Sequence, residues 1–260
     1  MSASVHTAIE DGIATLTLKR GREMNSLDAV TAQAVCDAVA AFTADPAVRV
    51  LVLAGEGPAF SAGGDFNWVL RWPRLESTER QAGAEAMMNA VQAIYDFPKP
   101  SIARVHGAAV GGGIGLMLAC DYAIAVSTAR FGLTSARNGL LAAIAIPVLV
   151  EAVGPRVARQ LLIHGGTFEA AEAERLGLID RVVEPAALDE AVDALARELK
   201  LGAPSVQALI KKLVPAVDAL PHDSQVAAML SRHVAEQCIT EEALEGMRAF
   251  LDKRKPRWAV

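Results

Sequence analysis

The sequence predicts an α/β protein with mainly parallel strands, followed by a helical C-terminal region. Three observations support this fold class. Residues 48–53 form a nearly continuous β-branched and apolar run, which is typical of a strand buried on both faces. Strand-like and helix-like segments alternate through residues 79–126. After about Val183 only helical patterns follow, and Pro185 marks the break.

The N-terminal elements follow from their local patterns. Residues 5–18 contain a Glu-Asp-Gly turn at 10–12 and then alternate apolar with threonine residues, which predicts a β-hairpin. Residues 28–44 carry apolar side chains at helical spacing and end before Pro46, so they predict a helix that leads into the buried strand.

The remaining elements continue this alternation and then give way to helices. Helices are predicted at 79–97 and 112–119, and strands at 100–105 and 122–126. With no repeat and no low-complexity linker, we expect the C-terminal helices to dock on the core. These four helices are predicted at 188–199, 205–214, 224–238 and 241–253.

Composition limits the classes of function. Of the 260 residues, 52% are hydrophobic and 5% aromatic, so the core consists mostly of small aliphatic side chains. A net charge of −5 argues against nucleic acid or an anionic membrane as a partner. No leader pattern opens the sequence, and no apolar run approaches the roughly 18 residues of a membrane span. Because Cys36, Cys120 and Cys238 are few and widely spaced, we expect reduced thiols in a soluble, cytoplasmic protein.

Several common catalytic motifs are missing. The glycines at 111, 112, 113 and 115 do not fit G-x-G-x-x-G, and no lysine follows them as in a phosphate-binding loop of the Walker type. The sequence has neither H-E-x-x-H nor G-x-S-x-G, and its five histidines are scattered. We therefore expect no metal site, no serine hydrolase and no dinucleotide fold.

The glycine-rich stretch 109–115, AVGGGIG, precedes the apolar run LMLAC. Glycine costs a helix about 1 kcal/mol relative to alanine, so such a cluster needs a compensating role. A glycine-rich turn that opens a helix presents free N–H groups to a phosphate or an oxyanion. Tight packing of helix against strand explains it equally well, and the residues alone leave both hypotheses open.

Two longer segments, Pro58–Trp68 (PAFSAGGDFNW) and Lys99–Gly113 (KPSIARVHGAAVGGG), resemble the enoyl-CoA hydratase/isomerase, or crotonase, superfamily. Further matches extend the resemblance over nearly the whole chain, at 119–121, 131–134, 166–179 and 249–255. The resemblance implies a crotonase spiral of ββα units over 1–195 that binds an acyl-CoA thioester, and a helical region over 196–260 that supports trimers or hexamers. It also implies a role in fatty acid metabolism and no cofactor beyond the coenzyme A of the substrate.

The resemblance assigns Gly64 and Gly112 as the two backbone N–H donors of an oxyanion hole for the thioester carbonyl. It assigns substrate contacts less firmly, since each of these residues is also compatible with a surface or core role. The positions are Arg22, Met24, Ala62, Gly63 and Gly111 for coenzyme A, Trp68 and Leu70 for the acyl pocket, and Lys253 in a basic segment near a phosphate.

The sequence departs from the family pattern where hydratases carry two catalytic glutamates. Gly115 and Ser135 occupy these positions. Glycine has no titratable group, and an unassisted serine hydroxyl is too weak an acid or base near pH 7. Hydration by the two-glutamate mechanism is therefore doubtful. Asp65 and His106 are tentative substitutes, although Asp65 could instead cap the next helix and His106 could be a packing residue.

Residues 134–140 and 142–147 resemble members that act on methylglutaconyl-type substrates. Within them, Arg137 and Asn138 could meet a substrate carboxylate or handle protons through water, and a structural salt bridge is the alternative for Arg137. Three functions remain open: a hydratase/isomerase-family enzyme with a displaced acid or base, a non-catalytic acyl-CoA binder, and a thioesterase or decarboxylase of the same family.

Overall fold

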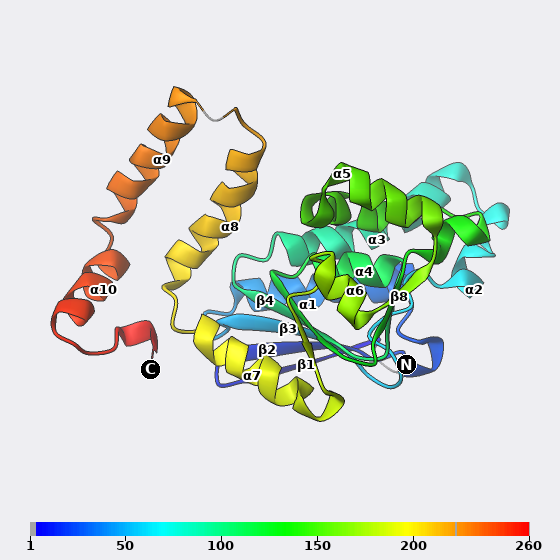
Figure 1. Cartoon of the computed structure of the whole chain (residues 1–260), viewed down its shortest axis with the longest axis horizontal. Coiled ribbons are helices and arrows are strands. Elements are labelled where there is room, and N and C mark those ends of the chain that lie inside the picture. The colour runs from blue at the N-terminus through cyan, green and yellow to red at the C-terminus, as the bar shows by residue number, and fades with distance from the viewer. Residues whose placement is uncertain (1–3, 222, 260) are drawn as a thin grey trace.

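The computed structural model describes residues 4–221 and 223–259, which form two β-sheets surrounded by helices (Figure 1). The larger sheet has the strand order β1-β2-β3-β4-β6-β9, and the smaller has the order β5-β7-β8. The strands are β1 (Val5–Glu10), β2 (Ile13–Leu18), β3 (Val50–Gly55), β4 (Ser101–Val105), β5 (Ala108–Val110), β6 (Tyr122–Val126), β7 (Arg130–Gly132), β8 (Thr167–Glu169) and β9 (Arg181–Val183).

The larger sheet confirms the predicted hairpin and the parallel strands. Strands β1 and β2 pair in antiparallel fashion with Glu10 opposite Ile13, and every later pair in this sheet is parallel. All six residues of β3 are buried, as expected for a central parallel strand. The strand begins two residues later than predicted, because a turn at residues 46–47 precedes it and the N–H groups of Arg49 and Val50 both donate to the Gly12 carbonyl.

The helices cover both faces of the larger sheet, with α3, α4 and α5 on one face and α7 on the other (Figure 1). Nearly all predicted helices are present, with small shifts at their ends. They are α1 (Ala29–Ala44), α2 (Phe66–Val69), α3 (Ser77–Tyr95), α4 (Gly112–Leu118), α5 (Ile146–His164), α6 (Ala170–Arg175), α7 (Leu188–Leu199), α8 (Pro204–Asp218), α9 (Ser224–Gln237) and α10 (Glu241–Leu251). No helix in the described ranges is both long and apolar enough to cross a membrane.

Helices α8, α9 and α10 form an arm that stands beside the core (Figure 1). Helix α7 docks on the sheet as expected, whereas α8 has no buried residue. The predicted domain boundary at 195/196 falls inside α7. Two polar attachments join the arm to the core. Lys211 pairs with Asp121 at 2.7 Å, and Arg49 donates to the carbonyls of Gly202 and Trp258, each at 2.8 Å. The expectation that all C-terminal helices dock on the core is therefore wrong for the arm.

The smaller sheet was not predicted, and it supports the glycine-rich stretch. Each of its three strands has only three residues, too few for a clear apolar alternation. Strand β5 leads directly into Gly111 and α4, and the Gly111 N–H donates to the carbonyl of Gly132 at the end of β7 at 2.8 Å. This sheet thus fixes the entry to α4.

Candidate active site

Two glycine loops, residues 61–65 and 109–113, lie against each other. The Val110 N–H donates to the Ser61 carbonyl at 2.9 Å, so the loops pair like short parallel strands. Gly63 has φ +83°, and a Cβ there would lie 2.6 Å from the Val110 oxygen and 2.7 Å from the Gly112 nitrogen. Only glycine permits this conformation and this approach. The loops can approach this closely because Gly63 has no side chain where it meets the backbone of Val110 and Gly112.

In the first loop, one backbone N–H is left free. The other four N–H groups donate within the protein: Ser61 to the Ala108 carbonyl at 3.0 Å, Ala62 to the Met24 carbonyl at 2.8 Å, Gly63 to Ser61 Oγ at 3.2 Å, and Asp65 to the Leu27 carbonyl at 2.8 Å. The Gly64 N–H has no acceptor among residues 4–221 and 223–259. A Cβ at Gly64 would meet no atom within 4 Å, so this residue borders open space.

The second loop shows the same pattern. The Gly111 N–H is bound by Gly132, whereas the Gly112 N–H has no acceptor in the described part of the chain. Gly112 opens α4, where free N–H groups and the helix dipole favour negative charge. The structure confirms the packing hypothesis for part of the glycine cluster, and the anion-binding hypothesis stays a prediction. Gly113 packs tightly, since its Cβ would overlap the Ser61 carbonyl, and Gly112 presents a free donor.

The position of the first expected glutamate, Gly115, is filled by backbone. A Cβ at Gly115 would lie 3.1 Å from the Ile144 carbonyl oxygen and 3.3 Å from the Ala145 Cα. These residues belong to a short 3-10 helix, η4 (Ala143–Ala145), which packs along α4. The Ile144 side chain also lies over Gly112. An apolar segment therefore occupies the space that a side chain at Gly115 would need.

The position of the second expected glutamate, Ser135, faces the glycine loops. Ser135 lies in a 3-10 helix, η3 (Thr134–Asn138), that follows β7. Its Oγ is 3.7 Å from the point where a Cβ on Gly111 would stand. The hydroxyl is half-buried and close to the loop that carries the Gly112 donor. Unlike Gly115, this position can direct a side chain toward the loops.

Asp65 is engaged in holding the first loop. One carboxylate oxygen accepts the Trp68 N–H at 3.2 Å and so caps α2, and the other accepts Arg20 at 2.7 Å. Burial raises the pKa of Asp65, but the hydrogen bond and charge of Arg20 and the backbone N–H groups of Trp68 and Asn67 together outweigh burial, so the pKa lies below its usual value. The carboxylate is ionised near neutral pH and both oxygens are bound, which matches the capping alternative.

His106 lies at the other end of β5 from Gly112. Its Nε2 is 2.8 Å from the Gly57 carbonyl, and its Nδ1 is 3.5 Å from a nitrogen of Arg104. The His106 carbonyl accepts the Phe60 N–H at 2.9 Å, so the residue lies where the paired segments begin. The structure does not bring this imidazole to the two free N–H groups.

Comparison with known proteins identifies the family. The sequence model of the enoyl-CoA hydratase/isomerase family matches residues 8–260. The chain belongs to this family. A Thermus thermophilus protein provisionally named an enoyl-CoA hydratase is 37% identical over 96% of the chain and 99% of that protein. Carnitinyl-CoA dehydratase of Salmonella typhi is 32% identical over 99% of each. The structure of an enoyl-CoA hydratase from Shewanella pealeana matches with a TM-score of 0.94 at 29% identity, over 98% of this chain and 96% of the other.

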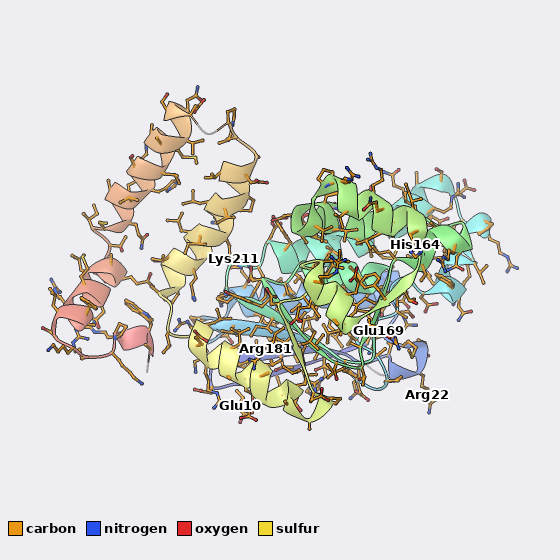
Figure 2. The ribbon with its side chains drawn as sticks, viewed as in Figure 1. Glu10, Arg22, His164, Glu169, Arg181 and Lys211 are labelled. Atoms are coloured by element: carbon orange, nitrogen blue, oxygen red, sulfur yellow. The ribbon has the colours of Figure 1, made fainter. Side chains whose placement is uncertain are left out.

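The crotonase fold brings three of the expected coenzyme A positions together. Met24 and Ala62 are joined by a backbone hydrogen bond, and Arg22 precedes Met24 in the same loop. Arg22 and Lys19 line an open cavity of about 940 Å³ on the side of the molecule away from the arm (Figure 2). Lys253 follows α10 in the arm, so within one chain the structure does not bring it to Arg22 (Figure 1).

The expected acyl-pocket residues lie on the segment that follows the first loop. The Trp68 ring packs edge-on against Trp72, with centroids 5.1 Å apart. Both rings lie over Gly83 of α3, where a Cβ would be 2.8 Å from the Trp68 ring. Leu70 is 75% exposed. Trp68 is therefore packed at the edge of the core against Trp72 and α3. Leu70 points away from the core.

Arg137 and Asn138 make local contacts in and around η3. Arg137 Nε donates to the His164 carbonyl at 3.1 Å, and Asn138 donates to the Thr134 carbonyl at 3.4 Å. Neither pairs with a carboxylate among the described residues, so the salt bridge considered for Arg137 is not formed. Both side chains are exposed beside Ser135.

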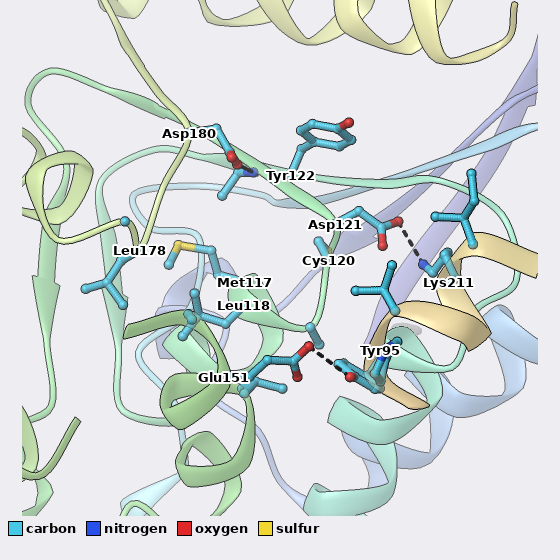
Figure 3. Close-up of a pocket in the computed structure, with 18 residues that line it drawn as sticks. Tyr95, Met117, Leu118, Cys120, Asp121, Tyr122, Glu151, Leu178, Asp180 and Lys211 are labelled. Carbon is cyan, nitrogen blue, oxygen red and sulfur yellow. Dashed lines mark hydrogen bonds and ion pairs between the residues drawn. The ribbon is translucent and has the colours of Figure 1, made fainter. Parts of the chain in front are cut away.

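A separate cavity of about 350 Å³ lies at the opposite end of α4, between the core and α8 (Figure 3). Tyr95 donates to Glu151 at 3.0 Å on one wall, and Lys211 pairs with Asp121 at 2.7 Å on another. Burial and Glu151 raise the pKa of Tyr95 to about 12. This cavity is lined by Leu118 at the end of α4, so it is distinct from the site at Gly112.

Sequence reasoning missed three polar residues that hold the first loop: Arg20, Asn25 and Ser61. Asn25 and Ser61 are fully buried, and Arg20 pairs with both Asp65 and Asp28. A signal was present, because buried polar side chains need partners and Ser61 lies inside the glycine motif itself. Each of the three also has a partner 31 to 45 residues away in sequence, and no local pattern reveals such contacts.

Proposed function

We propose that this protein is an acyl-CoA enzyme that stabilises a thioester enolate in an oxyanion hole formed by the Gly64 and Gly112 N–H groups. The observation that carries the proposal is that these two N–H groups lack acceptors within the described residues, while the N–H groups of Gly63, Asp65 and Gly111 beside them are bound. The loops that present them are in direct contact. Where an oxyanion donor has been removed from an enzyme, the loss is about 3 to 4 kcal/mol.

The proposed chemistry begins with polarisation of the thioester carbonyl. As negative charge develops on the carbonyl oxygen, two fixed N–H donors and the N-terminus of α4 stabilise it more than they stabilise the neutral ground state. The protein supplies this stabilisation from its backbone, so the proposal requires no metal or cofactor beyond the coenzyme A carried by the substrate. Arg22, Met24 and Ala62 would contact that coenzyme A.

Hydration through two glutamates is not part of this proposal. Gly115 and Ser135 offer no carboxylate, and both oxygens of Asp65 are bound to Arg20 and Trp68. This supports a reaction in which enolate stabilisation does most of the work. The same observation favours a second function, binding of acyl-CoA without turnover, and the experiment must separate the two.

Self-association is also part of the proposal. The arm exposes large apolar side chains, with Ile239 and Leu251 each 77% exposed and Phe250 82% exposed. Exposed apolar side chains grouped on one element favour burial against another chain. We propose a trimer or hexamer built through the arm, which sedimentation velocity can test. The free thiols Cys36, Cys120 and Cys238 are consistent with the cytoplasmic location that we propose. The proposed role in fatty acid metabolism rests on the family alone.

The first experiment uses 4-dimethylaminocinnamoyl-CoA, whose absorption shifts to longer wavelength when its thioester oxygen is polarised. We expect native protein to bind it with a red shift that free coenzyme A abolishes by competition. Binding without a red shift would overturn the oxyanion-hole proposal.

The second experiment follows the loss of enoyl-thioester absorbance with crotonyl-CoA and a branched enoyl-CoA. Native protein is compared with Ser135→Glu and with the neutral control Ser135→Gln. Turnover by native protein would establish an enzyme that bypasses both glutamate positions. Native protein could instead show the red shift but no turnover of these substrates, while Ser135→Glu alone is active. That result would favour binding without turnover, or a different reaction.

A further inference from the structure

The direction of the Gly64 N–H depends on the peptide units on either side of Gly63. The Gly63 carbonyl and the Gly64 N–H belong to one trans peptide, so they point in opposite directions. Because the Gly63 carbonyl accepts the Leu27 N–H at 2.6 Å, the Gly64 N–H points away from Leu27. The preceding peptide must also be held, since glycine rotates more freely than any other residue.

Ser61 holds that preceding peptide. Its hydroxyl accepts the Gly63 N–H at 3.2 Å and donates to the Asn25 carbonyl at 2.9 Å. Ser61 is fully buried, so both partners would be unsatisfied without the hydroxyl. The bond to Asn25 connects the first glycine loop to residues 24–27, a segment we call the strap, and the bond from Gly63 lies within the loop.

The strap itself is rigidly placed through Asn25. The Asn25 side chain donates to the carbonyls of Glu56 and Ala59 at 2.9 and 2.7 Å, and accepts the Arg20 N–H at 2.9 Å. The backbone of Asn25 has φ +54°, a conformation that asparagine tolerates better than most residues. The carbonyl to which Ser61 donates is therefore a fixed point.

We propose that Ser61 is the positioning residue of the oxyanion hole, an inference that rests on the proposed function. By binding the Gly63 N–H, its hydroxyl removes that group from competition for the substrate oxygen. It also fixes the Ala62–Gly63 peptide, so the next peptide, which Leu27 holds at the Gly63 carbonyl and which carries the Gly64 N–H, cannot turn freely about Gly63. The Ser61 side chain acts through the backbone and does not itself contact the thioester.

A purely structural role for Ser61 makes a different prediction. In that case replacement lowers stability but leaves the polarisation of bound ligand intact. Positioning predicts that polarisation is lost while recognition of the coenzyme A moiety is kept. Polarisation of the bound thioester and affinity for coenzyme A therefore have to be measured separately.

The test compares Ser61→Ala with native protein, using 4-dimethylaminocinnamoyl-CoA for polarisation, coenzyme A for affinity, and thermal unfolding for stability. Val39→Ala, in the core of α1, is the control for lost stability. Thr31→Val is the matched control for a buried hydroxyl, because the Thr31 hydroxyl has no partner among the described residues. If Ser61→Ala does not fold, Ser61→Cys, with a weaker donor and acceptor, takes its place.

We expect Ser61→Ala to lose most of the red shift and to bind coenzyme A with native affinity, with Ser61→Cys intermediate. Both controls should keep the full red shift, even where Val39→Ala unfolds at a lower temperature. A native red shift in Ser61→Ala, or in Ser61→Cys if only that variant folds, would overturn the inference and leave the proposed function standing. Absence of a red shift in native protein would overturn both.

Discussion

Alanine substitution at two adjacent glycines, Gly63 and Gly64, should have opposite effects on stability. Gly63 combines φ +83° with a Cβ position that overlaps the Val110 oxygen and the Gly112 nitrogen, both of which are backbone atoms. Gly64 has no positive φ and nothing within 4 Å of its Cβ position. The two residues lie in the same loop, so each variant is the control for the other.

The magnitude follows from these two environments. At Gly63, the left-handed conformation costs alanine about 1–2 kcal/mol, and forcing a methyl group against fixed atoms costs about 1–3 kcal/mol more. The sum, about 2–5 kcal/mol, corresponds to a fall in melting temperature of about 4–20 °C for a domain of this size. At Gly64 the reduced freedom of the unfolded chain should stabilise the protein by about 0.4–1 kcal/mol.

The assay is thermal unfolding followed by ligand binding. Gly63→Ala should melt well below native protein, and Gly64→Ala at or slightly above it. The new methyl group of Gly64→Ala stands in the open space beside the free N–H, so this variant should lose the red shift of 4-dimethylaminocinnamoyl-CoA despite its stability. Equal melting temperatures for the two variants would refute the assignment of close contact to Gly63 and open space to Gly64.

Four other predictions test separate parts of the structure. Gly115→Glu should be expressed poorly or melt several degrees below native protein, whereas Ser135→Glu should melt at the same temperature as native protein. The reverse order of melting temperatures would contradict the packing of η4 on α4. Because the pKa of folded Asp65 lies below its unfolded value of about 3.9, its ionic contribution to stability is complete above that pH and disappears as pH falls through the folded pKa. The stability gap between native protein and Asp65→Asn should therefore narrow below about pH 4, and a constant gap would count against the Arg20 pair. Ultraviolet titration should show a phenolate step near pH 12 that is missing in Tyr95→Phe, and a Tyr95 step at an ordinary pKa would contradict its burial beside Glu151. Arg49→Ala should make the C-terminal tail more sensitive to protease, because the carbonyls of Lys200, Gly202 and Trp258 lose their shared donor. An unchanged rate of digestion would show that other contacts hold the arm.

Long elements with a clear period were predictable from the sequence. Three elements begin and end close to their predicted bounds: the β1–β2 hairpin, α1 and β3. The pattern of buried residues in each is set within that element, so the local sequence reveals it. Helix α5 was not predicted, since Gly154 and Pro155 interrupt its pattern. In the structure the backbone is kinked there, with Gly154 at φ 73° and ψ 161°.

The candidate site was predictable only in part. The resemblance located Gly64 and Gly112, and the structure shows that their N–H groups lack internal acceptors within the described residues. It did not reveal the strap, because the contacts of Asn25 and Ser61 join segments 36 residues apart, and hydrogen bonds between distant loops leave no periodic signal. For the same reason, the filling of the space at Gly115 by Ile144 could not be predicted.

Gly115 and Ser135, the two positions where the resemblance led us to expect glutamates, lie in physically different surroundings. Gly115 is part of the packing, because η4 uses the space beside it and a side chain there must displace backbone. Ser135 lies half-exposed in η3, so we expect a longer side chain to be accommodated there. A single carboxylate can therefore be restored at 135, but a second one at 115 requires η4 to move. We therefore expect any activity gained by Ser135→Glu to come from a one-carboxylate mechanism that depends on the proposed oxyanion hole for the remaining stabilisation.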